Sequence, residues 1–396
     1  MKLAIVSRYP PAECGIAEYT WFLVSSLVNA SKASIIVIGN KDVPKEATEP
    51  RLSDVEVHRA FVSASNDYSG ILEVIRSAKP DVVHVQHDYS FFPQDVEFLK
   101  FLEKCREVCR KVVVTMHTVK KPIGIARAVA GVTTFRDGAR EDFELVLFQR
   151  KLVELSDVVV VHSYLQEFEL WSQGADIDKV KIVPHGTLIN PYCSKTRSEL
   201  INELMELGIA LENELIVFLP GFIRSDKGLD TALKVFDIVS RRFDIALVLG
   251  GAPQGRDSLE LRDRLAKMAS KRSKVVFLER FVDRDTMLKL FALSDIVILP
   301  YREVPGLIGV SGVLHLAMGS FKPLVCTRVP RLVEYCERVP ELCARQGDVM
   351  EFAYKLMNLI ENLEAYRKEL EPVWKYALET SWDRIALKHL QLYETH

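Results

Sequence analysis

The chain has 396 residues, of which 48% are hydrophobic and 27% charged, and its formal net charge is −2. This length predicts two or three domains, each with an ordinary hydrophobic core. The near-neutral charge argues against a nucleic-acid-binding protein, because such proteins are usually basic.

Short apolar runs alternate with segments of helical periodicity through the first half of the sequence. Because these runs are apolar throughout, they predict strands covered on both faces, as in a parallel sheet. No signal-peptide pattern precedes the first run and no stretch of about 18 apolar residues occurs, so we expect a cytoplasmic protein without a membrane-spanning helix. The predicted strands are residues 2–7, 34–39, 81–86, 111–116, 157–162 and 180–185, and the predicted helices are 17–28, 93–109 and 140–155.

The same pattern restarts after a polar segment at residues 185–199. The repetition predicts two doubly wound α/β domains, residues 1–185 and 186–375. An amphipathic C-terminal segment, 376–396, is expected to form a helix that packs back on the first domain. The second set of strands is predicted at 214–221, 245–251, 274–281, 295–301 and 322–327, with helices at 228–241, 258–270 and 284–291.

The seven cysteines do not indicate a disulfide framework, because their number is odd and the chain is long. Cys105 and Cys109 share a helical face but have no His or Cys partner nearby, which argues against a metal site. Cys326 follows an apolar run and is expected in the core. We therefore expect no metal ion.

A basic segment runs from Lys100 to Lys151, with 12 Lys and Arg against 6 Asp and Glu, a local excess of +6. The interpretation that we favour is a solvated helix surface. The alternative is a patch that faces an anionic membrane or an anionic acceptor.

In doubly wound sheets, ligands bind beyond the carboxyl ends of the strands. The first such loop, "SRYPPAECGIAEYT" (7–20), places Gly15 where a helix N-terminus could meet an anion. The alternative is an ordinary connection between strand and helix. The dinucleotide pattern GxGxxG is absent, which disfavours a dehydrogenase.

The loop "GFIRSDKGLDTA" (221–232) also joins a strand to a helix. Arg224 and Lys227 lie at the positive end of that helix, where basic side chains and free amides suit a phosphate or diphosphate. The alternative is a capped helix with a solvated lysine. The spacing excludes a Walker A loop.

Four histidines, His84, His87, His117 and His185, lie at or near the ends of predicted strands. A lone histidine is more often a core or surface residue than a functional one. The wide separation of the four in the sequence argues against a shared metal ion.

The fourth stretch, "LPYREVPGLIGVSGVLHLAMGSFKPLV" (299–325), places small residues directly before a helix. Gly309, Ser311 and Gly312 would let a ligand approach bare backbone amides. The alternative is a tight connection in which the glycines serve geometry alone.

Taken together in this order, the four stretches resemble a retaining glycosyltransferase of family 4, with two Rossmann-like domains facing a central cleft in the GT-B fold. The resemblance implies that Lys227 holds the donor diphosphate with help from Arg224, although Phe222 stands where the family usually has an arginine. His117 would lie beside the anomeric centre of the donor sugar. The backbone of Ser311, Gly312, Val313 and Leu314, together with Gly15, would bind the diphosphate, and Arg280, Phe281 and Val282 would edge the nucleobase.

One departure from the family concerns its pair of glutamates, E-x7-E. Alignment on "AMGSFKP" places Ile308 and Leu316 at those two positions. Glu303 is the remaining carboxylate in the loop and a candidate for contact with the sugar, as a third catalytic residue beside His117 and Lys227.

The implied activity is transfer of a hexose from a nucleotide-diphosphate sugar, GDP-mannose or UDP-glucose, to a sugar, glycan or lipid-linked acceptor with retention of configuration. The resemblance implies no metal or other cofactor, and the sequence does not indicate an oligomeric state. Two alternatives stay open. One is a retaining phosphorylase on the same fold, and the other is a nucleotide- or sugar-binding protein without turnover.

Overall fold

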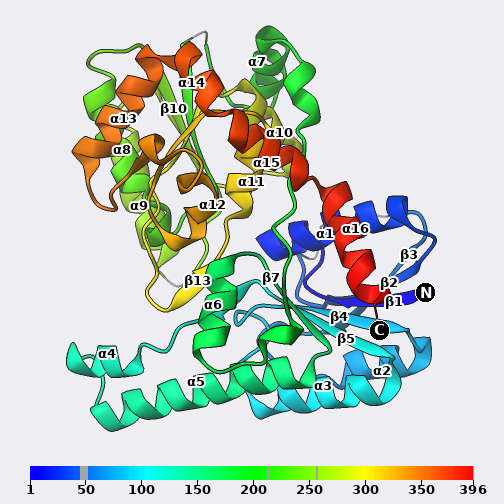
Figure 1. The fold of residues 1–396 in the computed structure, drawn as a ribbon. Coiled ribbons are helices and arrows are strands. Elements are labelled where there is room, and N and C mark those ends of the chain that lie inside the picture. Colours follow the sequence, from blue (N-terminus) through cyan, green and yellow to red (C-terminus); the bar gives the residue numbers. More distant parts are fainter. Residues whose placement is uncertain (45–51, 213, 256, 396) are drawn as a thin grey trace. The chain divides into compact units, whose positions relative to one another are not determined.

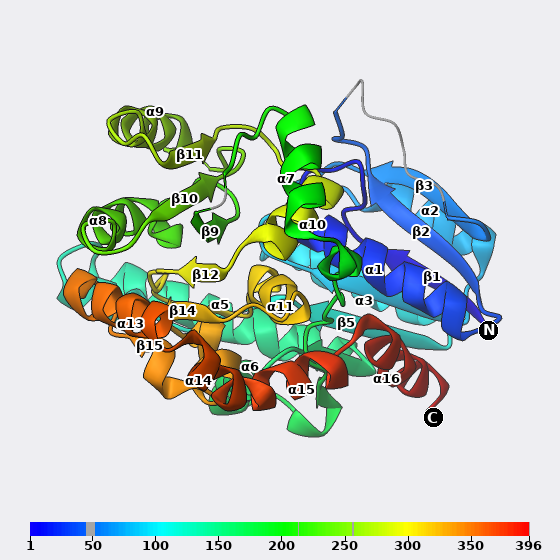
Figure 2. The same cartoon turned by 90° about the horizontal axis from the view of Figure 1, so that it is seen from above.

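The computed structural model describes residues 1–44, 52–212, 214–255 and 257–395. The chain forms two compact units, each built around its own parallel sheet (Figures 1 and 2). Among the described residues, no helix combines the length and apolar character needed to cross a membrane. Unit 1 comprises Met1–Gly186, Pro305–Val310 and Trp382–His396, and unit 2 comprises Thr187–Val304 and Ser311–Ser381.

Unit 1 contains a seven-stranded parallel sheet with the strand order β3-β2-β1-β4-β5-β7-β8. Its central strands are buried along their whole length, as their continuous apolar runs predict. Helices α1 and α16 cover one face, and α3 and α5 cover the other (Figure 1). The strands are β1 (Lys2–Val6), β2 (Ser34–Asn40), β3 (Val55–Phe61), β4 (Val82–His87), β5 (Lys111–Met116), β7 (Val158–Val161) and β8 (Val180–Ile182).

The helices of unit 1 follow the strands in the usual alternation. Helix α5 (Phe135–Leu155) begins five residues before the predicted start, because Thr134 caps it by accepting a hydrogen bond from the Asp137 amide. The other helices are α1 (Gly15–Ala30), α2 (Ser69–Ala78), α3 (Val96–Val108), α4 (Gly124–Val129), α6 (Tyr164–Ser172) and α16 (Trp382–Glu394).

Unit 2 repeats the plan with six parallel strands in the order β11-β10-β9-β12-β14-β15. Two Rossmann-like sheets confirm the predicted fold class. The strands are β9 (Leu215–Pro220), β10 (Ile245–Gly250), β11 (Val275–Leu278), β12 (Ile296–Leu299), β14 (Leu324–Thr327) and β15 (Cys343–Ala344).

Nine helices among the described residues of unit 2 accompany these strands. They are α7 (Arg197–Glu206), α8 (Leu229–Val239), α9 (Ser258–Ala269), α10 (Arg284–Leu293), α11 (Gly312–Gly319), α12 (Val333–Cys336), α13 (Val349–Glu361), α14 (Leu363–Glu369) and α15 (Glu371–Glu379).

The C-terminal helix α16 is an integral part of unit 1. It packs against α1, and the Lys111 ammonium of β5 donates a hydrogen bond to the Leu392 carbonyl at 2.7 Å. The ring of Trp382 occupies the place of a side chain at Gly186, where a Cβ atom would lie 2.2 Å from the indole. Gly186 is therefore needed for the helix to dock.

A short segment from the middle of the chain also belongs to unit 1. Strand β13 (Leu307–Gly309) pairs antiparallel with β6 (Thr118–Lys120), directly after His117. A Cβ atom on Gly309 would lie 2.8 Å from the His117 carbonyl oxygen. The close approach of β13 and β6 is therefore a structural reason for a glycine at position 309, and it matches the alternative in which the glycines of this stretch serve geometry.

Candidate functional site

The basic loop of unit 2 lies at the point where the strand order of the sheet reverses, between β9 and β12. A short turn (Ser225–Lys227) follows β9, and Gly228 then adopts a left-handed conformation with φ of 69°. A Cβ atom on Gly228 would lie 1.9 Å from the Pro300 carbonyl oxygen. The glycine thus holds the Lys227 loop against the end of β12, at the ligand-binding position of a doubly wound sheet.

Three cationic side chains gather there around one carboxylate. Asp226 accepts hydrogen bonds from Arg224 Nε at 2.8 Å and from Arg331 Nη1 at 2.7 Å. The ammonium of Lys227 lies 3.9 Å from the centre of the Tyr301 ring. Burial opposes ionisation of Asp226, but the three cations outweigh it and lower its pKa. The cluster keeps a net positive charge, which suits an anionic ligand.

The ammonium of Lys227 is unusually easy to deprotonate. Desolvation is the main cause, the charges of Arg331 and Arg224 add to it, and together they lower its pKa to about 7 despite the nearby Asp226. A dianionic ligand placed beside this lysine would restore its charge.

The N-terminus of α11 lies next to the same loop. Ser311 caps the helix by accepting a hydrogen bond from the Leu314 amide at 3.3 Å. The amides of Gly312 and Val313, in the first turn, have no intrahelical acceptor. A Cβ atom on Gly221 would lie 3.8 Å from Val313 Cγ2, so the start of the basic loop and the start of the helix are neighbours.

Arg280, Phe281 and Val282 line a pocket of about 330 Å³ beyond the end of β11. Arg280 Nη2 donates a hydrogen bond to the Leu207 carbonyl oxygen at 2.9 Å, which fixes one wall of the pocket. Phe222 approaches Phe281, with ring centroids 6.3 Å apart. Phe222 stands where the family usually has an arginine. Its ring therefore lies near Phe281, which lines the pocket.

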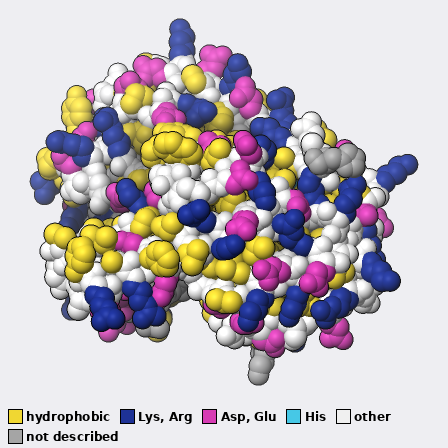
Figure 3. Space-filling model, turned by 60° about the horizontal axis from the view of Figure 1, so that its bottom comes forward, with side chains coloured by type: hydrophobic (Ala, Val, Ile, Leu, Met, Phe, Trp, Pro, Cys, Tyr) yellow, Lys and Arg dark blue, Asp and Glu magenta, His cyan; other side chains and the backbone are white. Residues whose placement is uncertain are grey.

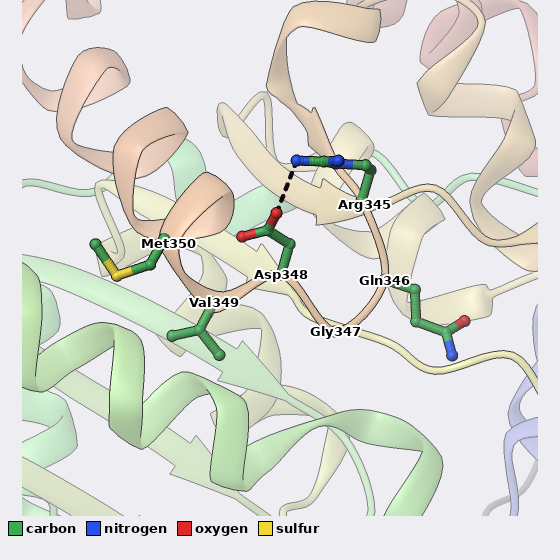
Figure 4. A pocket seen from close by; sticks show the side chains of 6 residues that line it. All are labelled: Arg345, Gln346, Gly347, Asp348, Val349 and Met350. Atoms are coloured by element: carbon green, nitrogen blue, oxygen red, sulfur yellow. Dashed lines mark hydrogen bonds and ion pairs between the residues drawn. The ribbon is translucent and has the colours of Figure 1, made fainter.

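Glu303 lies beside a second pocket of unit 2, of about 460 Å³, at the end of β15. Its backbone amide donates a hydrogen bond to Gln346 Oε1 at 2.9 Å, whereas its exposed carboxylate makes no hydrogen bond or ion pair with a described residue. Figure 4 shows the Arg345–Asp348 ion pair at this turn, with Gln346 directed away from it. The six lining residues are Arg345, Gln346, Gly347, Asp348, Val349 and Met350.

In unit 1, histidines follow several neighbouring parallel strands. His87 ends β4, His117 follows β5 and His162 follows β7. His117 Nδ1 lies 3.2 Å from His162 Nε2, and His117 Nε2 lies 2.9 Å from Gln86 Oε1. Burial, and then the neighbouring histidines, hold the pKa of His117 well below its usual value. His117 is therefore neutral at physiological pH.

The hydrogen bonds of this histidine pair require a definite number of protons. His162 Nδ1 lies 2.9 Å from the Val183 carbonyl oxygen, which can only accept. Three N–H donors are needed on the two rings: toward Val183, between the rings and toward Gln86. Two neutral imidazoles supply two. With both rings neutral, the chain is satisfied when the Gln86 amide turns its NH₂ group toward His117.

The other predicted residues of unit 1 have separate surroundings. His84 is buried and hydrogen-bonds Tyr393 and Thr115, each at 2.7 Å, which is a core role. His185 contacts the rings of Tyr19 and Trp382. Gly15 begins α1, and a Cβ atom there would meet nothing within 4 Å. Neither backbone strain nor packing in unit 1 demands a glycine at this position.

Comparison with known proteins identifies the family. The family model described as glycosyl transferases group 1 matches residues 213–362. An uncharacterized glycosyltransferase of Methanocaldococcus jannaschii is 30% identical over 353 residues, which cover 84% of this chain and 82% of that relative. The chain belongs to the glycosyltransferases, with a glycosyl transferases group 1 domain at residues 213–362.

Solved structures resemble this glycosyltransferase over its whole length. Sucrose-phosphate synthase from Thermosynechococcus elongatus superposes with a TM-score of 0.74 at 17% identity, covering 99% of this chain and 98% of that one. Anabaena HepE in complex with UDP and glucose gives a TM-score of 0.68 at 15% identity, covering 99% of both chains. At these identities the likeness concerns the fold, which is the predicted GT-B type.

Several residues of the glycosyltransferase that surround the candidate sites were not singled out from the sequence. Asp226 and Arg331 complete the cation cluster, and Gln86 and His162 complete the histidine chain. Arg331 and His162 each follow a predicted strand, so the rule that ligands bind beyond strand ends could have found them. Gln86 lies inside an apolar run, where the sequence gives no comparable signal.

Proposed function

We propose that this glycosyltransferase transfers a hexose from a nucleoside-diphosphate sugar, GDP-mannose or UDP-glucose, to a sugar, glycan or lipid-linked acceptor with retention of configuration. The observation that carries the proposal is the cation cluster around Lys227 at the strand-order reversal of unit 2, beside the N-terminus of α11. A diphosphate bears negative charge on adjacent groups, and this arrangement offers three side-chain cations and free helix amides to it.

The proposed reaction breaks the bond between the sugar's anomeric carbon and the diphosphate oxygen. Negative charge grows on the leaving diphosphate, and Lys227, Arg224 and Arg331 stabilise it there. The acceptor hydroxyl attacks on the same face of the sugar, and its proton passes to the departing phosphate oxygen. No carboxylate base is needed, and because side chains supply the positive charge, we expect no requirement for a metal ion.

The pocket lined by Arg280, Phe281 and Val282 is the proposed nucleobase site. Its volume of about 330 Å³ and the aromatic ring of Phe281 in its lining suit a heterocyclic base. HepE was solved with UDP, and a UDP-forming trehalose-phosphate synthase from Burkholderia xenovorans shares the fold, which makes UDP-glucose a reasonable first donor to test.

His117 is proposed to lie beside the anomeric centre of the donor sugar. Both of its ring nitrogens are engaged within unit 1, and a neutral ring held in this way would not repel an oxocarbenium-like carbon. Gly15 is proposed to lie near the donor phosphates, because a backbone amide at a helix N-terminus is available there without a side chain in the way. Glu303 remains the candidate for contact with the sugar hydroxyls.

An anionic membrane surface is the proposed location of a lipid-linked acceptor. Gly124 and Gly138 bring α4 and α5 into close backbone contact, since a Cβ atom on Gly124 would lie 2.1 Å from the Gly138 carbonyl oxygen. Around this hairpin, Val129 is 81% and Phe135 65% exposed, and the exposed Arg136 lies next in the chain. Figure 3 shows a face on which exposed hydrophobic side chains lie among charged side chains of both signs. Exposed apolar side chains on a hairpin suit contact with a membrane surface, and the positive charge is that of the whole segment from Lys100 to Lys151, which has 12 Lys and Arg against 6 Asp and Glu.

The decisive experiment is a thermal-shift panel with GDP, UDP, ADP and inorganic phosphate. One nucleoside diphosphate should raise the Tm of the wild-type protein, and Lys227→Ala should abolish the shift. Lys234→Ala, which changes an exposed lysine of α8, is the matched control and should keep the shift.

Each other outcome points elsewhere. Stabilisation by phosphate alone would favour the phosphorylase alternative. Stabilisation by a nucleotide, without transfer to any member of an acceptor panel, would favour the binding protein without turnover. No shift with any of the four would contradict the proposal.

A further inference from the structure

Three cysteine thiols of unit 2 converge from three different elements. Cys326 lies on β14, Cys336 ends α12 and Cys343 begins β15. The Cys326 sulfur lies 3.7 Å from that of Cys336 and 3.5 Å from that of Cys343, and all three sulfurs lie within 4.8 Å of one another. Cys326 and Cys343 occupy paired positions on neighbouring parallel strands, so the sheet itself fixes their approach.

The separation of the sulfurs matches metal coordination. A Zn–S bond of about 2.3 Å in tetrahedral geometry places neighbouring sulfur atoms about 3.8 Å apart. A single disulfide would use two of the three thiols and leave the third unexplained. Among the described residues with His, Cys, Asp or Glu side chains, these are the group placed to share one ion.

The surroundings of the thiols supply one positive charge and give an ion access. Arg328 Nε donates a hydrogen bond to the Cys343 carbonyl oxygen at 3.0 Å, and its positive charge acts on the thiols of Cys336 and Cys343. Three thiolates around a divalent ion leave a net charge of −1, which this guanidinium offsets. Cys326 and Cys343 are buried, whereas Cys336 is partly exposed and provides the entry.

We propose that Cys326, Cys336 and Cys343 bind one thiophilic d¹⁰ metal ion, of the class of Zn²⁺ and Cu⁺. Thiolate sulfur is the ligand that such ions prefer. Each thiol releases its proton to solvent as its sulfur binds the ion. Because two of the three thiols are buried in unit 2, we assign the site a structural role.

The ion would fix the segment between Cys326 and Cys336, which carries Arg331 of the cation cluster. Glu334 of the same segment hydrogen-bonds His315 of α11 at 3.1 Å. Binding of the ion is therefore expected to stiffen the support of Arg331 and of α11 together. This consequence, unlike the metal site itself, depends on the proposed donor site.

Metal content tests the proposal directly. The full-length protein, purified without chelator, should retain one Zn or Cu per chain by elemental analysis. The stripped, reduced protein should bind one Cd²⁺, with the ultraviolet charge-transfer absorption of cadmium thiolates. Cys336→Ser, at the partly exposed position, should lose both signals. The double variant Cys105→Ser/Cys109→Ser is the control. It changes a cysteine of α3 and the cysteine that directly follows this helix, and it should keep both the retained metal and the cadmium absorption.

The proposal would be overturned if the reduced protein took up no Zn²⁺, Cu⁺ or Cd²⁺, or if uptake survived in Cys336→Ser. A disulfide between Cys326 and Cys343 or Cys336 in the freshly isolated protein, seen by mass spectrometry of unreduced peptides, would also contradict it. Metal stoichiometry is independent of nucleotide binding. If one metal ion is retained but its removal leaves nucleotide affinity unchanged, the site stands and only its link to Arg331 fails.

Discussion

Gly309 and His117 are separated by 192 positions in the sequence, yet the backbone of one occupies the space of a side chain on the other. A Cβ atom on Gly309 would lie 2.8 Å from the His117 carbonyl oxygen, a contact that rotation of a side chain cannot relieve. The pairing of β13 with β6 therefore sets the backbone position of the proposed sugar-contacting histidine.

Gly309→Ala should separate the two short strands. We expect a destabilisation of about 1–3 kcal/mol, as for other insertions into tight packing, and a larger fall in kcat than in donor affinity, because His117 shifts while the Lys227 cluster is intact. Thermal unfolding and steady-state kinetics measure both. Ile308→Val, one residue earlier, is the control and should cost less than about 1.5 kcal/mol. Full activity in Gly309→Ala would show that the approach does not position His117.

Donor affinity should depend on pH through Lys227. Its pKa in the free protein is about 7, and a bound diphosphate favours the charged form and raises that pKa. Below pH 7 the lysine is already protonated and affinity is highest. Above pH 7 binding must take up a proton, so affinity should fall by up to about tenfold per pH unit.

Calorimetric titration with an intact nucleotide sugar measures this dependence, because its diphosphate diester has no titrating group of its own near neutrality. Lys227→Arg keeps a permanent charge and should flatten the profile. A wild-type profile that stays flat between pH 6 and 9 would contradict the assignment.

Arg331→Ala should weaken nucleotide binding by about tenfold to a hundredfold, the effect of losing one hydrogen bond to a charged group. Asp226 would keep only Arg224 as a partner and would oppose the ligand's charge. Arg272 offers a matched control, because its side chain is 18% exposed like that of Arg331 and pairs with an aspartate, Asp237. Equal losses of nucleotide affinity in Arg331→Ala and Arg272→Ala would indicate a general loss of stability instead.

Glu303→Gln separates sugar recognition from folding. The carboxylate is exposed and makes no hydrogen bond or ion pair with a described residue, so the isosteric amide should leave the Tm unchanged. We expect kcat/KM for the nucleotide sugar to fall while the affinity for the free nucleotide stays as in the wild type. Unchanged kcat/KM would remove Glu303 from the site.

Binding to lipid vesicles tests the exposed hairpin of α4 and α5. Val129→Ser/Phe135→Ser should reduce co-sedimentation with vesicles that contain anionic lipid, and raised salt should reduce wild-type binding as well. Leu259→Ser, which changes a 56% exposed leucine of α9, is the control. Wild-type protein that stays in the supernatant at low salt would dismiss the membrane contact.

The parts of the fold that could be predicted from the sequence are those that depend on continuous apolar runs. The strands β4, β5 and β9 are examples, since both faces of each are buried. Strand β3 (Val55–Phe61) was missed, because it lies at the sheet edge and most of its residues are only partly buried. Strands β6 and β13 have three residues each and exist only through their pairing.

The candidate sites divide in the same way. Lys227 could be found from its loop, because a glycine-bounded turn after a strand is a local pattern. The partnership of Asp226 with Arg331 spans 105 positions and depends on two loops meeting at one sheet edge. The cysteine cluster depends likewise on the register of β14 with β15, and its spacings of ten and seven residues fit no short metal-ligand pattern.

The docking of α16 on α1 has a consequence for the order of events during synthesis. The hydroxyl of Tyr393 and the carbonyl of Leu392, which bond His84 and Lys111, belong to a segment that is translated after all of unit 2. Unit 2 needs nothing beyond Ser381. Unit 1 begins to be translated before unit 2 but is completed only after it, and until then its nascent sheet exposes the apolar surface that α16 later covers.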